Sequence, residues 1–545
     1  MALAKALVYL TWTSTPLAWA YAIFYIALRA CYTQNLPTLV RHILQGTLPV
    51  GAQKHARLSQ CFSLRILFFY SVLEAFFSLY YARLIKKVQK PKFSHTASRE
   101  YVVKAITSAV RDGLATDDGK CDPVSDVVLD VKSPAHLPRI SKRLDYDDPR
   151  AVRFRKEMNG WFIGIDDHQI TSNDLRAWFS WSLFGKHYAE LKAEVETAPT
   201  DQHRQHQLEF IEDAVALFSA RSGLERFPDD VNLTPAELRL KRIMLLTLDP
   251  VEVNMRPLAL YATFKALNMY AYAAWAWRYG LERHTIGSVD YLIYIPPGWR
   301  VQDAASGAAP LPLVFLHGLG IGIAEYFFLV RAMFDARHEI PARPVLIPLQ
   351  PWTSADIFSA RFLEPWNADE CASLVLGMFE RYGFQKCGVT VLSHSMGTIL
   401  HAWLLKRYPT LLKRSTFVDP VCFQLWAPHL CYRFLYKKPA SFVEYSLRYF
   451  VAREVGTANV LMRNFDWSAN VLLLDEIPHR TDPQRVRIYL AGSDTVVDAP
   501  LLRDFLVRNG MKQVLHYTPG LHHGAFVMGP VNCNAQILQE LAAPL

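Results

Sequence analysis

A serine lies between two kinds of predicted secondary structure in "GVTVLSHSMGTILHAWLLKRYP", residues 388–409. β-Branched and apolar residues at 389–392 predict a strand, and apolar residues at helical spacing from Ile399 predict a helix. A nucleophilic serine on such a tight turn needs small neighbours. Gly397 is one of them, but the other position, usually glycine, is Ser393. Taken alone, the segment fits Ser395 as a helix cap better than as a nucleophile.

Residues elsewhere in the chain change that balance. An activated serine needs a base, an acid that orients the base, and N–H donors for the oxyanion. "VFLHGLG" places a His-Gly loop, residues 317–320, after a predicted strand upstream. Downstream, "IYLAGSDTVVDAP" places Asp494 after a strand, and "YTPGLHHGAFV" places His522 and His523 after the next one. The parts therefore occur in the order oxyanion loop, serine, acid, histidine, which is that of a known catalytic arrangement.

With these four motifs in order, the segment from about Tyr291 to the C-terminus resembles the α/β-hydrolase superfamily, over a little under half of the chain. The resemblance implies a mostly parallel sheet with helices on both faces, and a serine hydrolase of the lipase or esterase type. With its predicted membrane anchor and helical N-terminal region, the chain resembles fungal members of this superfamily. Carried over position by position, the resemblance implies Ser395 as nucleophile, Asp494 as acid, His523 as base, and Leu319 and Met396 as oxyanion N–H donors.

Alternatives remain open for the acid and the base. Asp419 is a serious competitor to Asp494, because "TFVDPV" also ends a predicted strand. Asp498 is a weaker competitor and a better candidate for a helix cap. We prefer His523 to His522 because a small residue, Gly524, follows it directly. His317 is predicted to brace the oxyanion loop and not to react.

Two other functions compete with ester hydrolysis. An acyltransferase could use the same acyl-enzyme, although no histidine here has aspartate five positions later. An inactive binding protein on the same fold would usually lack a triad residue, and here all three positions are filled. We expect a hydrophobic ester, with lipid acyl esters favoured, as substrate. We expect no cofactor and no metal site, since the eight cysteines form no CxxC pair and no zinc-type spacing.

Strands alternating with helices begin at Tyr291, which predicts the α/β domain, residues 286–545. The apolar runs predicted as strands are 291–295, 313–316, 345–347, 389–392, 416–418, 486–490 and 514–517. The aromatic insertion at about 421–484 is predicted to form a helical cap. A linker around 117–136 and a helical domain precede the α/β domain, within residues 91–285. "TPAE" at 234–237 predicts a capping box at a helix start.

The first 90 residues are predicted to form a membrane-anchor region. Ala6 to Leu28 carries no charge, which favours a membrane-spanning helix over a cleaved secretory signal. The second apolar segment, Cys61 to Ala82, contains Arg65 and Glu74, so whether it spans stays open. We expect a membrane location, with the endoplasmic reticulum and lipid droplets as candidates.

Composition also limits the partners. The chain has 545 residues, of which 51% are hydrophobic, and a formal net charge of +9. A basic cluster at Arg83, Lys86, Lys87, Lys90 and Lys92 fits solvent or phospholipid better than nucleic acid, because no nucleic-acid motif accompanies it. The sequence leaves the oligomeric state open.

Overall fold

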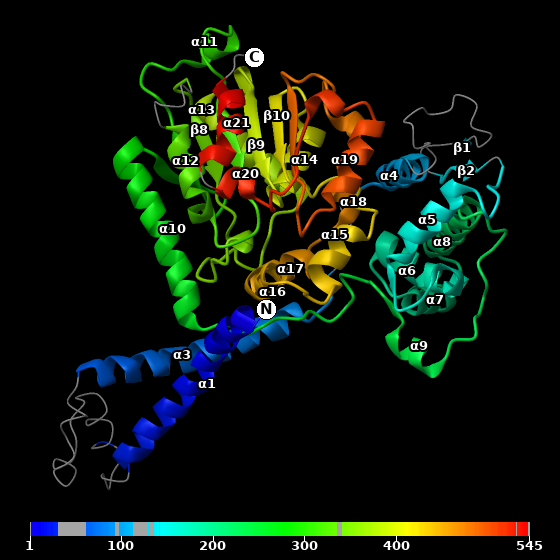
Figure 1. Ribbon diagram of the computed structural model, residues 1–545, viewed down its shortest axis with the longest axis horizontal. Coiled ribbons are helices and arrows are strands. Elements are labelled where there is room, and N and C mark those ends of the chain that lie inside the picture. The colour runs from blue at the N-terminus through cyan, green and yellow to red at the C-terminus, as the bar shows by residue number, and fades with distance from the viewer. Residues whose placement is uncertain are drawn as a thin grey trace. The chain divides into compact units, whose positions relative to one another are not determined.

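The computed structural model describes residues 2–30, 37, 62–92, 97–112, 129–130, 136–140, 142–334, 341–529 and 531–542. Figure 1 labels the helices and strands of the chain, which divides into two compact units. Unit 1 comprises Met1–Lys90, Val251–Leu267 and Pro439–Ala458. Unit 2 comprises Pro91–Pro250, Asn268–Lys438 and Asn459–Leu545. Unit 2 contains every residue that the sequence assigns to catalysis.

An eight-stranded sheet forms the centre of unit 2, in the order β12-β11-β10-β9-β7-β8-β6-β5. The strands are β5 (Glu282–Ile286), β6 (Val289–Tyr294), β7 (Leu313–Leu316), β8 (Val345–Pro348), β9 (Val389–His394), β10 (Leu412–Val418), β11 (Val486–Ala491) and β12 (Leu515–Thr518). β6 pairs antiparallel with both of its neighbours, and β8, β7 and β9 to β12 pair in parallel. This order, with one antiparallel strand second from the edge, is that of the α/β-hydrolase fold.

The structure confirms the seven strands predicted from apolar runs and adds an eighth. The added strand, β5, has the sequence ERHTI and is mostly exposed. It lies at the sheet edge and pairs only with β6, so no apolar run is needed to form it.

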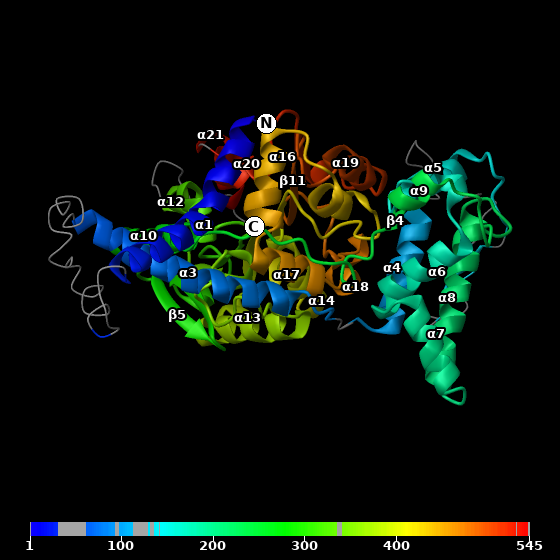
Figure 2. The ribbon, with the colours of Figure 1, turned by 90° about the horizontal axis from the view of Figure 1, so that it is seen from below.

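Helices cover both faces of the sheet. Figure 2 shows α20 (Ala525–Met528) and α21 (Val531–Ala542) on one side, and α13 (Ala368–Tyr382) and α14 (Gly397–Arg407) on the other. α12 (Phe327–Met333) packs with α20 and α21. The strands between them are buried on both faces, with β7, β8 and β9 buried along their whole length. The remaining α-helices here are α10 (Leu258–Tyr279), which continues from unit 1 into unit 2, α11 (Val301–Ala305) and α19 (Ala499–Arg508).

A helical segment precedes the sheet in unit 2. Its helices are α4 (Arg99–Asp112), α5 (Pro149–Asn159), α6 (Ser172–Phe184), α7 (Tyr188–Thr197), α8 (Gln202–Arg221) and α9 (Pro235–Leu240). The predicted capping box is confirmed, since the Glu237 N–H donates to Thr234 Oγ1 over 3.2 Å and the Thr234 N–H donates to Glu237 Oε2 over 2.7 Å. Most of the linker predicted at 117–136 lies outside the described residues.

The insertion after β10 is helical, as predicted. It contains α15 (His429–Cys431), a π-helix (Tyr432–Tyr436), α16 (Phe442–Leu447), a second π-helix (Arg448–Ala452), α17 (Val455–Arg463) and α18 (Trp467–Asn470). Its middle part, Pro439–Ala458, belongs to unit 1, and its two ends belong to unit 2.

The two N-terminal apolar segments form α1 (Ala2–Ala30) and α3 (Phe62–Val88). Among the helices of the described residues, none combines the length and the apolar character needed to cross a bilayer. The predicted membrane-spanning helix at 6–28 is therefore not supported. The helix itself forms, but polar residues at 11, 13, 14 and 15 interrupt its apolar run.

Candidate active site

Ser395 lies on a sharp turn between β9 and α14, at the carboxyl end of the sheet. Its φ angle is +50°, a left-handed conformation that a side chain other than glycine rarely adopts. The Ser395 N–H donates to the Val418 carbonyl over 3.0 Å, which ties the turn to β10. A strained backbone held in this way is typical of functional residues.

Two glycines allow the surrounding chain to approach this turn. A Cβ on Gly397 would lie 2.1 Å from the Leu316 carbonyl oxygen, so α14 could not start this close to β7 with any other residue. A Cβ on Gly318 would lie 2.9 Å from the Ser395 Cβ. Both glycines are therefore required by close packing at the serine.

We expect Gly397→Ala to lower the free energy of unfolding by about 1–3 kcal/mol, the usual cost of extra volume in a packed site. The matched control is Gly377→Ala in α13, where the new Cβ would meet only the flexible end of Ile286, at 3.1 Å. That control should be neutral or slightly stabilising, because alanine favours a helix. Denaturant melts of both variants check this, and equal stability would contradict the role of Gly397.

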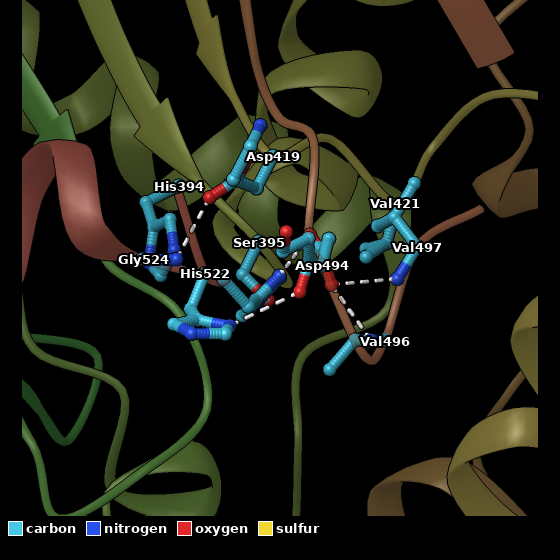
Figure 3. A network of polar contacts seen from close by, with 12 residues as sticks. His394, Ser395, Asp419, Val421, Asp494, Val496, Val497, His522 and Gly524 are labelled. Atoms are coloured by element: carbon cyan, nitrogen blue, oxygen red, sulfur yellow. Dashed lines mark hydrogen bonds and ion pairs between the residues drawn. The ribbon is translucent and has the colours of Figure 1, made fainter. Parts of the chain in front are cut away.

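Hydrogen bonds connect Ser395 to a histidine and an aspartate from two other loops. Ser395 Oγ lies 2.9 Å from His523 Nε2, and His523 Nδ1 lies 2.6 Å from Asp494 Oδ2. The other Asp494 oxygen accepts the N–H groups of Val496 (2.6 Å) and Val497 (2.9 Å) (Figure 3). A carboxylate only accepts, so Nδ1 carries a proton, and in the neutral form of the ring Nε2 accepts the serine hydroxyl.

His522, the alternative base, points elsewhere. It is exposed, and its Nδ1 lies 3.2 Å from the Ser493 carbonyl oxygen. His523 is thus the histidine that the structure places against both Ser395 and Asp494.

The charges around His523 favour its protonated form. Burial alone would lower the pKa of His523, but the charge of Asp494, its hydrogen bond and the charge of Asp419 together raise that pKa to about 9. An imidazolium formed during a reaction at Ser395 is therefore stabilised where it forms.

Asp419 lies beside these residues but contacts neither the histidine nor the serine by a hydrogen bond. Its φ is +44°, and its oxygens accept the N–H group of Ala491 (2.8 Å) and that of Gly524 (2.7 Å; Figure 3). Burial raises the pKa of Asp419 to about 6. Asp419 therefore ties the loop that carries His523 to the end of β11.

Asp419, Asp494 and His523 offer ligand atoms within 4.8 Å of one another, a spacing compatible with a metal ion. The two Asp419 oxygens accept backbone N–H groups, and His523 Nδ1 donates to Asp494. These contacts suit a hydrogen-bond network better than a metal site, because the donors point at the oxygens a cation would need.

Met396 follows Ser395 in the chain, and Leu319 follows Gly318, where an added Cβ would lie 2.9 Å from the Ser395 Cβ. Within the described part of the chain, neither N–H has an acceptor. The loop that carries Leu319 is held by a bond from the Gly320 N–H to the Thr353 carbonyl (2.9 Å) and by one from the Ile321 N–H to Glu325 Oε1 (2.9 Å). The pair is thus available to a developing negative charge.

Buried side chains support this loop, among them Tyr326, which the sequence did not single out. Tyr326 Oη accepts the Gly318 N–H (2.9 Å) and lies within hydrogen-bond distance, 2.7 Å, of His394 Nδ1. His394, the residue before the nucleophile, is therefore turned toward Tyr326. His317 Nε2 accepts the Gln350 N–H over 3.3 Å, in line with the bracing role predicted for His317.

The departure from glycine at Ser393 is accommodated by a second buried histidine. Ser393 Oγ lies 2.8 Å from His401 Nδ1, and His401 Nε2 lies 3.0 Å from Ser415 Oγ. Burial lowers the pKa of His401 to about 3, so the ring is neutral and structural. The spacing of eight residues between Ser393 and His401 gave no signal for this contact.

Asp498, the weaker candidate for the acid, caps α19 as predicted: its Oδ1 accepts the Leu501 N–H over 3.4 Å. Its other oxygen accepts from Arg433 Nη2 over 2.6 Å. Asp498 is therefore committed to a helix start and an ion pair.

Solved α/β-hydrolase structures resemble the chain over about half its length. An α/β-hydrolase enzyme from the metagenome of Mar Chica lagoon sediments in Morocco is 17% identical, with a TM-score of 0.32 over 48% of this chain and 96% of that one. A Bacillus subtilis carboxylesterase is 10% identical (TM-score 0.33; 52% and 99% covered). A bacterial membrane phospholipase A, a virulence factor, is 15% identical (0.32; 52% and 92%). No protein-family model and no curated protein matches the chain. The strand order, and not this likeness, carries the fold assignment.

Proposed function

We propose that the protein is a serine hydrolase that cleaves carboxylic esters through an acyl-enzyme on Ser395. The observation that carries the proposal is the continuous hydrogen-bond chain from Ser395 through His523 to Asp494. The N–H groups of Leu319 and Met396, which have no acceptor among the described residues, support it.

The first half of the reaction acylates the serine. Ser395 Oγ attacks the ester carbonyl carbon while its proton passes to Nε2 of His523. The N–H groups of Leu319 and Met396 stabilise the negative charge on the carbonyl oxygen. The carbon–oxygen bond then breaks, and the leaving alcohol takes the proton from His523.

The second half releases the acid. A water molecule gives a proton to His523 Nε2 and its oxygen attacks the acyl carbon. Ser395 leaves with the proton from His523, which restores the resting state. Throughout, Asp494 keeps Nδ1 protonated and stabilises the imidazolium.

The substrate we propose is an ester of a hydrophobic acyl chain, with lipid acyl esters favoured. The aromatic insertion starts at the nucleophile, because the Val421 N–H donates to Thr398 Oγ1 (3.1 Å), which donates to the Ser395 carbonyl (2.6 Å). Phe423 is buried against Phe417 and fills the core. Further along, partly buried apolar residues remain to contact a ligand: Leu430, Phe434 and Leu435.

We expect kcat/KM to rise from acetyl to longer acyl esters in mixed micelles, by at most about 0.8 kcal/mol for each methylene buried. Leu435→Ala should flatten this dependence, whereas Leu238→Ala, at an exposed position of α9, should leave it unchanged. Release of free acid, measured alongside the alcohol, distinguishes hydrolysis from transfer to a second alcohol. A rate that falls as the chain lengthens, or faster cleavage of amides, would contradict the proposed substrate.

A further inference from the structure

The strongest feature outside the active site is the pair of long helices in unit 1. α1 and α3 pack against each other through small and polar residues and through Tyr25 stacked on Phe68, with ring centroids 4.2 Å apart. On the α1 side the buried positions include Thr15, Ala18 and Ala22, and on the α3 side they include Ser71, Ala75 and Ser78. Small residues at a helix–helix contact let the backbones approach closely, which is the packing that helices use in lipid.

Polar side chains between these helices are hydrogen-bonded. Glu74 is fully buried, and its carboxylate accepts from Thr15 Oγ1 (2.5 Å) and from the Leu258 N–H (2.8 Å). Trp19 Nε1 donates to Ser78 Oγ over 2.9 Å. Glu74, one of the two charges that left the membrane position of α3 open, therefore points inward and has partners.

The outer faces carry the apolar residues. Phe76 and Leu73 of α3 are 68% and 58% exposed, and Leu10 and Phe24 of α1 are 71% and 62% exposed. A helix pair in water buries its apolar stripe and exposes its polar one. Here large apolar side chains cover the outer faces as well, as expected when hydrocarbon is the solvent.

One stripe of α3 changes from apolar to basic along its length. At alternating steps of three and four residues it runs through Ile66, Phe69, Leu73, Phe76, Tyr80, Arg83 and Lys87. Lys86 lies beside its basic end and is also exposed. The apolar part of the stripe, residues 66–80, is about 22 Å long at 1.5 Å per residue. This length is less than the thickness of a bilayer's hydrocarbon core, about 30 Å.

We propose that the α1–α3 hairpin seats unit 1 in one leaflet of an anionic phospholipid bilayer. The exposed apolar faces lie among the acyl chains, and Arg83, Lys86 and Lys87 meet head-group phosphates. Lipid is favoured over a second copy of this chain because the stripe ends in a run of basic residues, which complement anionic head groups and would repel the same residues of a copy. The proposal does not depend on the chemistry assigned to Ser395.

Flotation of the full chain with vesicles tests this inference. We expect binding to vesicles of phosphatidylcholine mixed with phosphatidylserine, and at least a tenfold loss of binding for the double variant Leu73→Asp, Phe76→Asp. The matched control, Leu238→Asp with Leu240→Asp, changes two equally exposed leucines at α9 of unit 2 and should float like wild type. A second double variant, Lys86→Gln with Lys87→Gln, should lose the preference for anionic vesicles and its sensitivity to salt.

Two readouts keep the outcomes separable. The double variant Leu73→Asp, Phe76→Asp should hydrolyse a water-soluble short-chain ester at the wild-type rate. This result would also show that the variant is folded. Ser395→Ala should float normally, so a failure of the proposed esterase activity would leave the membrane proposal intact.

Three results would overturn the proposal: wild type that stays unbound to both vesicle types, an outer-face variant that floats as well as wild type, or basic-end substitutions without effect. Light scattering without lipid tests the alternative that a second copy of the chain binds these faces. A dimer that the outer-face substitutions dissociate would assign these faces to a second copy instead.

Discussion

Ser395→Ala is expected to abolish covalent labelling by a fluorophosphonate and to lower kcat/KM for ester hydrolysis by at least about a thousandfold. The reason is geometric: Ser395 Oγ is the oxygen that His523 Nε2 faces at 2.9 Å, on a turn with a strained φ of +50°. Labelling followed by gel fluorescence, and initial rates with a short-chain ester, measure the two effects.

The matched control is Ser393→Ala. Ser393 is also buried and lies two residues earlier, but its hydroxyl bonds to His401 and not to His523. The fluorophosphonate should still label Ser395 in that variant. Loss of the bond to His401 should instead lower its free energy of unfolding. Labelling of Ser395→Ala at the wild-type rate would end the serine-hydrolase proposal.

Asp494→Asn is expected to lower kcat by about ten-thousandfold, the size seen when a triad acid loses its charge with its shape preserved. An amide at this position can present its N–H₂ to Nδ1, which then holds the histidine in the wrong tautomer. Because the charge of Asp494 helps to raise the pKa of His523 above its usual range, its removal should also move the acid limb of the kcat/KM profile to lower pH.

Asp419→Asn separates the two carboxylates. Asp419 accepts from the backbone N–H groups of Ala491 and Gly524, so an asparagine keeps one acceptor and loses the other. We expect a smaller fall in rate, traced to a less firmly held His523 loop. If Asp419→Asn lost the larger share of the rate at matched folding, Asp419 and not Asp494 would be the acid.

The positions of Ser395, Asp494 and His523 were accessible from the sequence because each follows a strand with a recognisable apolar run. The carboxyl ends of parallel strands share one edge of the sheet, so residues at those ends meet whatever the intervening chain does. The choice between His522 and His523 depended on a single neighbouring glycine, and only the coordinates place the second histidine between serine and acid.

Other features could not be predicted from local patterns. β5 is charged and exposed because it is an antiparallel edge strand. Tyr326 and His394 are 68 residues apart in the sequence. Ser393 of β9 meets His401 of α14, so both contacts form only when the helices pack on the sheet. The orientation of Glu74 could not be predicted either. An apolar run shows which residues avoid water, but it does not show which face of the helix turns toward the other helix.

The most direct test of the proposed chemistry is mass spectrometry of the enzyme quenched during turnover of a carboxylic ester. An acyl-enzyme mechanism requires the mass of the acyl group on the peptide that contains Ser395, and its disappearance as free acid accumulates. Hydrolysis that proceeds with no acyl mass on that peptide, or with the acyl group on another residue, would contradict the assignment of Ser395 as the nucleophile.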